Sequence, residues 1–439
     1  MMNPTRKFFA ALCALVLALT AGACLVACGE SERDQPIDKI ALTENAADYT
    51  KYVNTYGRVF YNPDLGGVTF INSASGFEVC FRGTALRAQV QTVASGGSYA
   101  NGMFSVFVDG ESDSEAKILK TERSVGGISD EVTIADGLTD REHVVKVLKR
   151  TPSNRDRLIV SQISTDGELL PAPAKPSLNI EFYGDSITCG EGVLRPYKDE
   201  NGNIKDSALY TQETQNVFSS YAGECAKDLG AAFRVFGRGG IALKYTDFTK
   251  ERYTVANNYN SIAVDLAAAE YPYDYNSYRP DAVVIYLGTN DYFRSLKGVA
   301  KDDNGIAYSK GGMKIAVVNF VRDVIGRYYG KNIPVFICSN LMAPGSGLDE
   351  IMENAVTELK SDFPNAVAVK FDKGVTAGVG GHPVVEDSEI AGAKLAGEIR
   401  KVLGIGNERF MQSRSQRTGS GFLSALFANR CIISQNVLK

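Results

Sequence analysis

The sequence predicts two domains, an all-β sandwich followed by an α/β domain whose parallel sheet has helices on both faces. Three observations predict this. The chain has 439 residues, which is enough for two domains. From about residue 38 to 170, short β-branched and aromatic runs recur between glycine-containing turns. From residue 177 to 404, apolar strand-like runs alternate with segments of helical spacing, which is typical of βαβ units.

In the first domain, the clearest strand-like runs are residues 67–71, 77–81 and 103–108. Asp109-Gly110 after the third run is a hairpin signal. Short strands at regular spacing predict an antiparallel sandwich over residues 38–170. Residues 171–176, which contain three prolines, are expected to be a stiff linker.

The second domain, residues 177–404, is expected to contain five strands and at least four helices. The strands are predicted near 179–183, 232–236, 282–287, 333–338 and 366–371, and the helices near 217–229, 312–328, 349–360 and 386–403. The last helix is the best marked, because apolar residues recur at helical spacing from Ile390 to Val402. Residues 405–439 lack this pattern, so we expect a disordered or accessory tail.

The composition argues against two classes of partner, nucleic acids and metal ions. The formal net charge of −4 provides no basic field for a nucleic-acid partner. Eight cysteines without a Cys-x-x-Cys pair, together with two histidines, do not suggest a metal site, and we expect no cofactor.

The amino terminus has the features of a targeting segment. Arg6-Lys7 precede an apolar run from Phe8 to Ala27, and Leu25-Val26-Ala27-Cys28 fits a bacterial lipobox. We therefore expect residues 1–28 to be a lipoprotein signal, Cys28 to carry the lipid, and residues 29–37 to be a tether. The protein would then be held at the bacterial membrane outside the cytoplasm. An ordinary cleaved secretory signal is the alternative.

Gly184-Asp185-Ser186 follows the first strand of the α/β domain. This order places a serine hydroxyl at the carboxyl end of a strand, where open α/β sheets carry their ligands. A helix beginning at Ser186 would also direct its dipole at the reacting group. A serine nucleophile needs a nearby base. Of the two histidines, His143 lies in an alternating, strand-like segment, whereas His382 follows two glycines in a loop, so His382 is the candidate base.

Two further sequence blocks accompany the serine and histidine segments. Gly239-Gly240 and Gly288-Thr289-Asn290-Asp291 lie between the serine and histidine segments. The side-chain amide of Asn290 can stabilise a developing oxyanion. An ordinary Asn-Asp turn is the alternative for that block.

The four blocks together resemble the SGNH (GDSL-type) hydrolases. The resemblance implies that Ser186 is the nucleophile and His382 the base. It also implies that the Ser186 N–H, the Gly240 N–H and the Asn290 amide form the oxyanion hole, with Gly239 replacing Gly240 if the register differs by one. With a β domain in front, the chain looks most like carbohydrate esterase family 2. That resemblance implies an N-terminal jelly roll, a flavodoxin-like α/β domain, and removal of O-acetyl groups from polysaccharides of the xylan or glucomannan type.

One position departs from the superfamily pattern. An aspartate usually lies three residues before the histidine, but this chain has Val379 there. We therefore expect a Ser–His dyad in which a backbone carbonyl orients the imidazole, as in some family-two esterases. Asp372, Glu386 and Asp387 are the alternative orienting groups, although the last two fit better in the first turn of the final helix.

Two polar or tyrosine-rich insertions, residues 195–215 and 244–279, are expected near the active site. Tyr273, Tyr275 and Tyr292 are the candidates for a wall that binds sugar rings. Acyl lipids, thioesters and acetylated peptidoglycan are alternative substrates. An inactive carbohydrate-binding lipoprotein is the alternative outside the enzymes.

Overall fold

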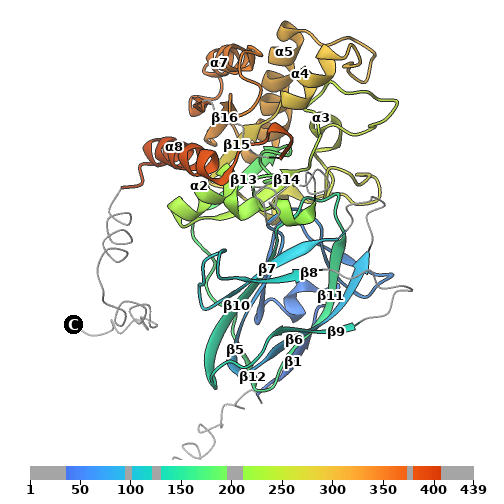
Figure 1. Cartoon of the computed structure of the whole chain (residues 1–439), viewed down its shortest axis with the longest axis vertical. Coiled ribbons are helices and arrows are strands. Elements are labelled where there is room, and N and C mark those ends of the chain that lie inside the picture. Colours follow the sequence, from blue (N-terminus) through green and yellow to red (C-terminus); the bar gives the residue numbers. More distant parts are fainter. Residues whose placement is uncertain (1–35, 94–100, 121–129, 195–210, 373–378, 407–439) are drawn as a thin grey trace, which may run out of the picture. The chain divides into compact units, whose positions relative to one another are not determined.

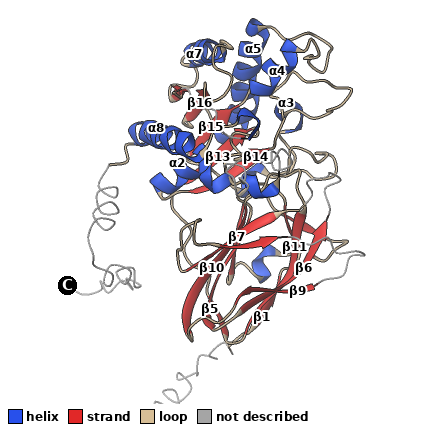
Figure 2. Cartoon of the chain, viewed as in Figure 1, coloured by secondary structure: helices blue, strands red, loops and turns tan. Residues whose placement is uncertain are grey.

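Among the described residues, twelve strands precede the α/β part of the chain and form two antiparallel sheets (Figure 2). This computed structural model describes residues 36–93, 101–120, 130–194, 211–372 and 379–406. One sheet has the order β3-β4-β11-β6-β9 with β1 beside β11, and the other has the order β12-β5-β10-β7-β8 with β2 beside β5. The strands are β1 (Lys39–Ala41), β2 (Val53–Tyr56), β3 (Phe60–Asn62), β4 (Gly67–Phe70), β5 (Gly76–Gly83), β6 (Leu86–Val93), β7 (Met103–Val108), β8 (Lys117–Lys120), β9 (Asp130–Ala135), β10 (Arg141–Lys149), β11 (Arg157–Thr165) and β12 (Glu168–Leu170).

The two sheets bury alternate side chains, as the sequence pattern predicts. On β5, Phe77, Val79 and Phe81 are fully buried, and on β10 Val145 and Val147 are fully buried. Successive side chains of a strand point to opposite faces, so each sheet contributes one apolar face to the core. The expected β-rich first part of the chain is confirmed.

The Asp109-Gly110 turn forms, but it does not make a tight hairpin. Both residues have positive φ, and Glu111 N donates to Val108 O across the turn, which matches a type I′ turn. The partner strand β8 begins only at Lys117. The intervening chain is held by its own hydrogen bonds, including that from Ser112 Oγ to Glu115 Oε2 at 2.7 Å.

The second part of the chain is built on a five-stranded parallel sheet with the order β14-β13-β15-β16-β17. Counted along the chain this is 2-1-3-4-5, the flavodoxin-like order that the resemblance implies. The strands are β13 (Asn179–Gly184), β14 (Ala232–Gly237), β15 (Ala282–Tyr286), β16 (Val335–Ser339) and β17 (Ala366–Lys370). All five agree with the predicted positions.

Helices cover both faces of this sheet (Figure 1). The α-helices are α2 (Tyr221–Leu229), α3 (Val255–Asn258), α4 (Thr289–Leu296), α5 (Lys310–Phe320), α6 (Gly326–Tyr329), α7 (Leu348–Leu359) and α8 (Val385–Leu403). A π-helical segment, Val321–Ile325, joins α5 to α6, and the short 3₁₀ turns are Ala46–Asp48, Gln212–Thr214, Val217–Ser219, Tyr275–Ser277 and Val379–Gly381. No helix within the described ranges combines the length and apolarity needed to cross a membrane.

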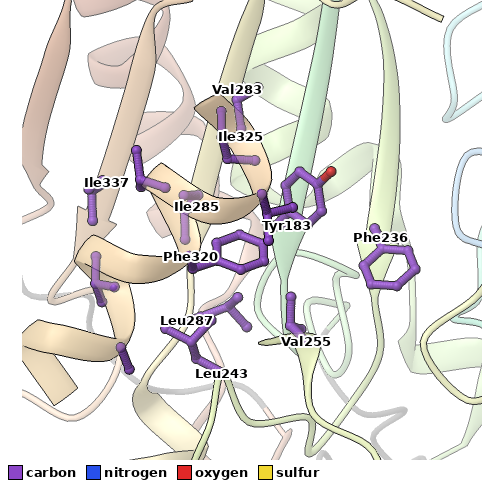
Figure 3. Close-up of a cluster of buried hydrophobic side chains, with 14 of the residues drawn as sticks. Tyr183, Phe236, Leu243, Val255, Val283, Ile285, Leu287, Phe320, Ile325 and Ile337 are labelled. Carbon is purple, nitrogen blue, oxygen red and sulfur yellow. The ribbon is translucent and has the colours of Figure 1, made fainter. Parts of the chain in front are cut away.

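Each face of the parallel sheet has its own core. On β15, Val283 and Ile285 pack with α5 and α7, whereas Val284 and Tyr286 pack with α2 and α8. Figure 3 shows the first of these cores, in which Phe320 from α5 lies among the strand side chains. A strand buried on both faces needs apolar residues at consecutive positions, which explains the unbroken apolar runs in the sequence.

The sandwich and the α/β part pack against each other within one compact unit that begins at Lys39. Arg58 of the sandwich is buried against Glu181 of β13, with 3.1 Å between Nη2 and Oε1. The same guanidinium donates from Nη1 to the carbonyls of Tyr259 and Ser261 at 2.8 and 2.9 Å. The segment predicted as a linker is also bonded to β2, since Asn54 Nδ2 donates to Pro173 O at 2.7 Å.

We predict that Arg58→Met lowers the free energy of unfolding by about 3–5 kcal/mol, because it leaves the buried Glu181 carboxylate without its counter-charge. Urea unfolding followed by circular dichroism measures the change. The matched control is Arg82→Met, which breaks the exposed pair with Glu142. That variant is expected to cost about 1 kcal/mol or less. Equal losses in the two variants would contradict the prediction.

Candidate active site

The candidate site lies where the strand order of the parallel sheet reverses. β13 has β14 on one side and β15 on the other, so the chain leaves in opposite directions from the ends of β13 and β15. The crevice outside the carboxyl ends of such strands is the usual ligand site of open α/β sheets. Ser186 follows β13 and Asn290 follows β15, and the hydrogen bond from Asn290 to Asp185 shows that the fold brings the serine and asparagine segments together at this edge of the sheet.

The serine segment forms a series of turns, and the conditional expectation of a helix starting at Ser186 is wrong. Ile187 N donates to Asp185 Oδ1 at 3.0 Å, and Glu191 N donates to Ser186 O at 2.9 Å. A helix dipole therefore does not act on the hydroxyl. Among the described residues the Ser186 N–H has no acceptor, although the residue is buried. A free, buried N–H is the kind of donor that an oxyanion hole requires.

His382 follows a 3₁₀ turn, and a backbone carbonyl orients its ring. Nδ1 lies 2.9 Å from the carbonyl oxygen of Val379. A carbonyl can only accept, so Nδ1 carries the proton and Nε2 is the basic nitrogen. The loops of serine and histidine touch, because a Cβ on Gly192 would lie 2.9 Å from Val379 O and 3.5 Å from His382 Cβ.

The three alternative carboxylates have other positions. Asp372 is exposed, and Lys394 Nζ lies 3.3 Å from its Oδ2. Glu386 and Asp387 lie in the first turn of α8, as the sequence suggests. The orienting role of a third group concerns the tautomer and direction of the imidazole. The Val379 carbonyl meets both needs at the position where the superfamily usually has an aspartate.

Asp291 connects the third block to the loop that follows β14. Its carboxylate accepts the N–H groups of Leu243, Lys244 and Tyr245 at 2.8, 2.9 and 2.7 Å. Burial raises the pKa of the Asp291 carboxyl, and the three N–H bonds act in the opposite direction. These bonds fix the loop after the second block against α4, which carries Asn290.

Gly240 occupies a tight turn from Arg238 to Ile241, closed by a 3.3 Å hydrogen bond from Ile241 N to Arg238 O. Its φ is +75°, a value that favours glycine. The N–H groups of Gly239 and Gly240 both lack acceptors among the described residues. The register alternative between the two glycines therefore stays open, with Gly240 as the predicted donor.

Asn290 is not free in this structure. Its Nδ2 donates to Ile241 O at 3.1 Å and to Asp185 Oδ2 at 3.3 Å. Two N–H groups are thus already used, so Asn290 must exchange one bond before it can donate to an oxyanion. The longer bond, to Asp185, is the weaker one.

Burial is the main cause that raises the pKa of the Asp185 carboxyl to about 7, and the nearby carboxylates of Glu191 and Asp291 act in the same direction. Hydrogen bonding to the Ile187 N–H acts in the opposite direction. Asp185 bonds to its own loop and to Asn290, so its carboxyl braces the serine loop against α4.

The tyrosine candidates lie in different places. Tyr273 and Tyr275 are buried in the core, where their ring centroids lie 4.0 and 5.2 Å from the Arg58 guanidinium. Their rings pack against the buried Arg58 guanidinium, since a buried cation attracts aromatic faces, and so they do not form a sugar-binding wall here. Tyr292, on α4, is half-buried and packs at the edge of the same core. Cys28, the proposed lipid site, lies outside the described residues, as does most of the tail beyond residue 404.

His143 is a strand residue, as expected, but it is buried. Its Nδ1 lies 2.9 Å from Asp109 Oδ2 and its Nε2 lies 2.7 Å from Thr139 O. Both ring nitrogens thus have partners within the sandwich. Among the described residues, no group of three His, Cys, Asp or Glu side chains is placed to hold a metal ion.

Comparison with known proteins agrees with the two-part fold. Residues 55–173 match the family model described as carbohydrate esterase 2 N-terminal. The match confirms the resemblance to carbohydrate esterase family 2. A solved structure of a family two carbohydrate esterase from Clostridium thermocellum, in complex with cellohexaose, superimposes with a TM-score of 0.65 at 24% identity. The alignment covers 80% of this chain and 99% of that one, so the two share both the β-rich part and the SGNH-like sheet.

Two curated relatives give the sequence-level likeness. Cellulase/esterase CelE of Acetivibrio thermocellus is 28% identical over 369 residues, or 80% of this chain. This chain spans only 39% of the length of CelE. An acetylxylan esterase / glucomannan deacetylase of Cellvibrio japonicus is 24% identical over 280 residues, covering 63% of this chain and 70% of that protein.

Sequence reasoning missed the residues that hold the site together. Arg238 Nη1 donates to Gly239 O at 2.9 Å, and Arg294 Nη2 donates to Gly240 O at 2.7 Å. Arg294 lies four residues after Asn290 on α4, and this spacing was a usable signal that the two share a helix face. Arg238 offers no such signal beyond its place next to the glycine pair.

We predict that Asp291→Ala lowers the free energy of unfolding by about 3 kcal/mol or more, because three buried N–H groups lose their acceptor. Thermal or urea unfolding measures the loss. Asp166→Ala is the control: Asp166 accepts the N–H groups of Thr84 and Ala85 at an exposed turn, where water can replace it. A loss for Asp291→Ala no larger than the control loss would refute the bracing role.

Proposed function

We propose that this chain is a serine esterase that removes O-acetyl groups from a polysaccharide or oligosaccharide of the acetylxylan or glucomannan type. The observation that carries the proposal is the imidazole of His382, oriented by the Val379 carbonyl, beside the serine loop at the switch point of the sheet. The names of the relatives, acetylxylan esterase / glucomannan deacetylase among them, support this substrate class.

The proposed reaction has two half-steps. Ser186 Oγ attacks the acetyl carbonyl while His382 Nε2 takes the hydroxyl proton. The tetrahedral oxyanion is held by the N–H groups of Ser186 and Gly240 and by the Asn290 amide. His382 then protonates the departing sugar hydroxyl, which leaves Ser186 acetylated. Water, deprotonated by His382, attacks the acetyl-serine, and acetate leaves.

We propose further that the enzyme acts outside the cytoplasm, anchored through lipid on Cys28. The support is the sequence alone: a basic start, an apolar run and Leu25-Val26-Ala27-Cys28. Metabolic labelling with a fatty-acid probe, compared with Cys28→Ser, tests the anchor.

We predict that Ser186→Ala lowers acetate release from acetylated xylan and glucomannan by more than roughly 1,000-fold, since the nucleophile is lost. 4-Nitrophenyl acetate and a longer-chain ester complete the panel. Ser186-dependent release from glycans and the acetate ester, but not the long-chain ester, supports the proposal. Activity on the long-chain ester alone would make this a lipid esterase. No activity and no reaction of Ser186 with a phosphonate probe would favour an inactive carbohydrate-binding protein.

The orientation of His382 gives a separate prediction. Replacing each alternative carboxylate, by Asp372→Asn, Glu386→Gln and Asp387→Asn, is expected to leave kcat within about twofold, because the Val379 carbonyl already holds Nδ1 of His382. Replacing a carboxylate that truly oriented the histidine would cost roughly 10⁴-fold. A loss of that size in any single variant would replace the dyad by a triad.

A further inference from the structure

The two central residues of the turn that supplies the predicted oxyanion donor are glycines, so they have no side chains of their own to fix the central peptide. Gly239 and Gly240 occupy its two central positions, and the bond from Ile241 N to Arg238 O closes it. With φ of +75° at Gly240, the turn matches type II. Turns of types I and II differ in which way the central peptide faces. Two glycines accept either arrangement, so some other group must select one.

Arg238 contacts this central peptide directly. Its Nη1 donates to the Gly239 carbonyl at 2.9 Å, and its other terminal nitrogen pairs with the carboxylate of Glu251. The Arg238 side chain is 13% exposed and that of Glu251 19%, so solvent screens the pair little. The described residues contain no cis peptide bond. In a trans peptide, C=O and N–H point in opposite directions, so the Gly240 N–H faces away from the guanidinium.

The position of the turn gives this orientation a consequence. Gly237 at the end of β14 pairs with Gly184 at the end of β13, so the glycine turn and the serine turn leave the sheet side by side. A Cβ on Gly239 would lie 2.3 Å from the carboxylate oxygens of Glu191, which places the two loops in contact. The direction of the central peptide therefore decides whether a donor or an acceptor faces the serine loop.

We propose that Arg238 is a positioning residue of the oxyanion hole. It locks the Gly239–Gly240 peptide in the arrangement that presents the Gly240 N–H, and its charge-assisted bond to the carbonyl strengthens that N–H as a donor. This inference rests on the proposed esterase function and adds a residue to it. Arg238 acts through the peptide and does not itself take part in proton transfer.

Arg294 provides a matched comparison. It also donates a guanidinium hydrogen bond, but to the Gly240 carbonyl, which belongs to the next peptide unit. The N–H of that unit is that of Ile241, which is already bonded to Arg238 O. Losing Arg294 therefore loosens the loop without releasing the peptide that carries the oxyanion donor.

The test compares full-length wild type, Ser186→Ala, Arg238→Ala, Arg238→Lys, Arg294→Ala and Arg322→Ala on 4-nitrophenyl acetate. Arg322 is the distant control, since its guanidinium bonds to Asp362 and Glu358. Loss of one oxyanion donor typically costs roughly 100- to 1,000-fold, and misorientation of one is expected to lower kcat about 10- to 100-fold for Arg238→Ala. We expect KM to stay within about threefold, because the effect falls on the transition state.

The other variants and added guanidinium give further expected results. Arg294→Ala loses less kcat than Arg238→Ala, and Arg322→Ala equals wild type. Arg238→Lys, which keeps a cationic donor, retains more activity than Arg238→Ala, and added guanidinium ion restores part of the activity of Arg238→Ala. Arg238→Ala is expected to melt at a lower temperature than wild type, because it leaves Glu251 without its counter-charge, so kcat is compared at a temperature at which every variant is folded.

The inference is overturned if Arg238→Ala keeps full kcat, or if its loss equals that of Arg294→Ala and guanidinium has no effect. Failure of the esterase proposal looks different, because wild type would then hydrolyse the ester no faster than Ser186→Ala. A crystal structure of Arg238→Ala decides the matter without any activity. A reversed or mixed Gly239–Gly240 peptide supports the lock, and an unchanged single orientation refutes it.

Discussion

The buried ion pair between Arg58 and Glu181 is the interaction on which the arrangement of the chain depends. Both side chains are almost completely removed from solvent, so each charge is costly without the other. Glu181 lies on β13, the strand that leads directly into Asp185 and Ser186. The sandwich thus supplies the counter-charge for the strand that leads to Ser186, the proposed nucleophile. Separation of the two parts would leave the Glu181 carboxylate in an apolar core without its counter-charge. This cost explains why they form one compact unit.

The same ion pair explains why several tyrosines, including two from the tyrosine-rich insertion, are buried together. Tyr183, Tyr273 and Tyr275 surround the guanidinium with their rings, and the Tyr329 hydroxyl donates to Glu181. Rings offer a cation their negative faces, and hydroxyls satisfy the remaining lone pairs of the carboxylate. A tyrosine cluster near an enzyme site suggests sugar stacking from sequence alone. Here burial of a charge explains Tyr273 and Tyr275 without a ligand.

The sequence predicts the strands and helices well, but it predicts poorly which groups the polar side chains contact. The five parallel strands were found because strands buried on both faces are continuous apolar runs, and α8 because its apolar spacing is regular. His382 was found because the chain offers only two histidines. Arg58 was not found, because an arginine in an alternating β segment looks like a solvent-facing residue. Asp291 and Arg238 act on backbone groups, and nothing in a linear pattern tells which carbonyl or N–H a side chain will reach after folding.

The proposed reaction develops an oxyanion at the candidate site, so the charges around that site matter. Asp185, Glu191 and Asp291 place three buried carboxyl groups near the point where negative charge would develop. Three ionised groups would oppose that charge. Asp185 reduces the opposition, because a pKa of about 7 leaves it substantially protonated at neutral pH. Arg238 and Arg294, bonded to consecutive glycine carbonyls, add positive charge on the other side of the same peptides. The glycine turn is therefore the element through which a net acidic site can still present donors to an anion.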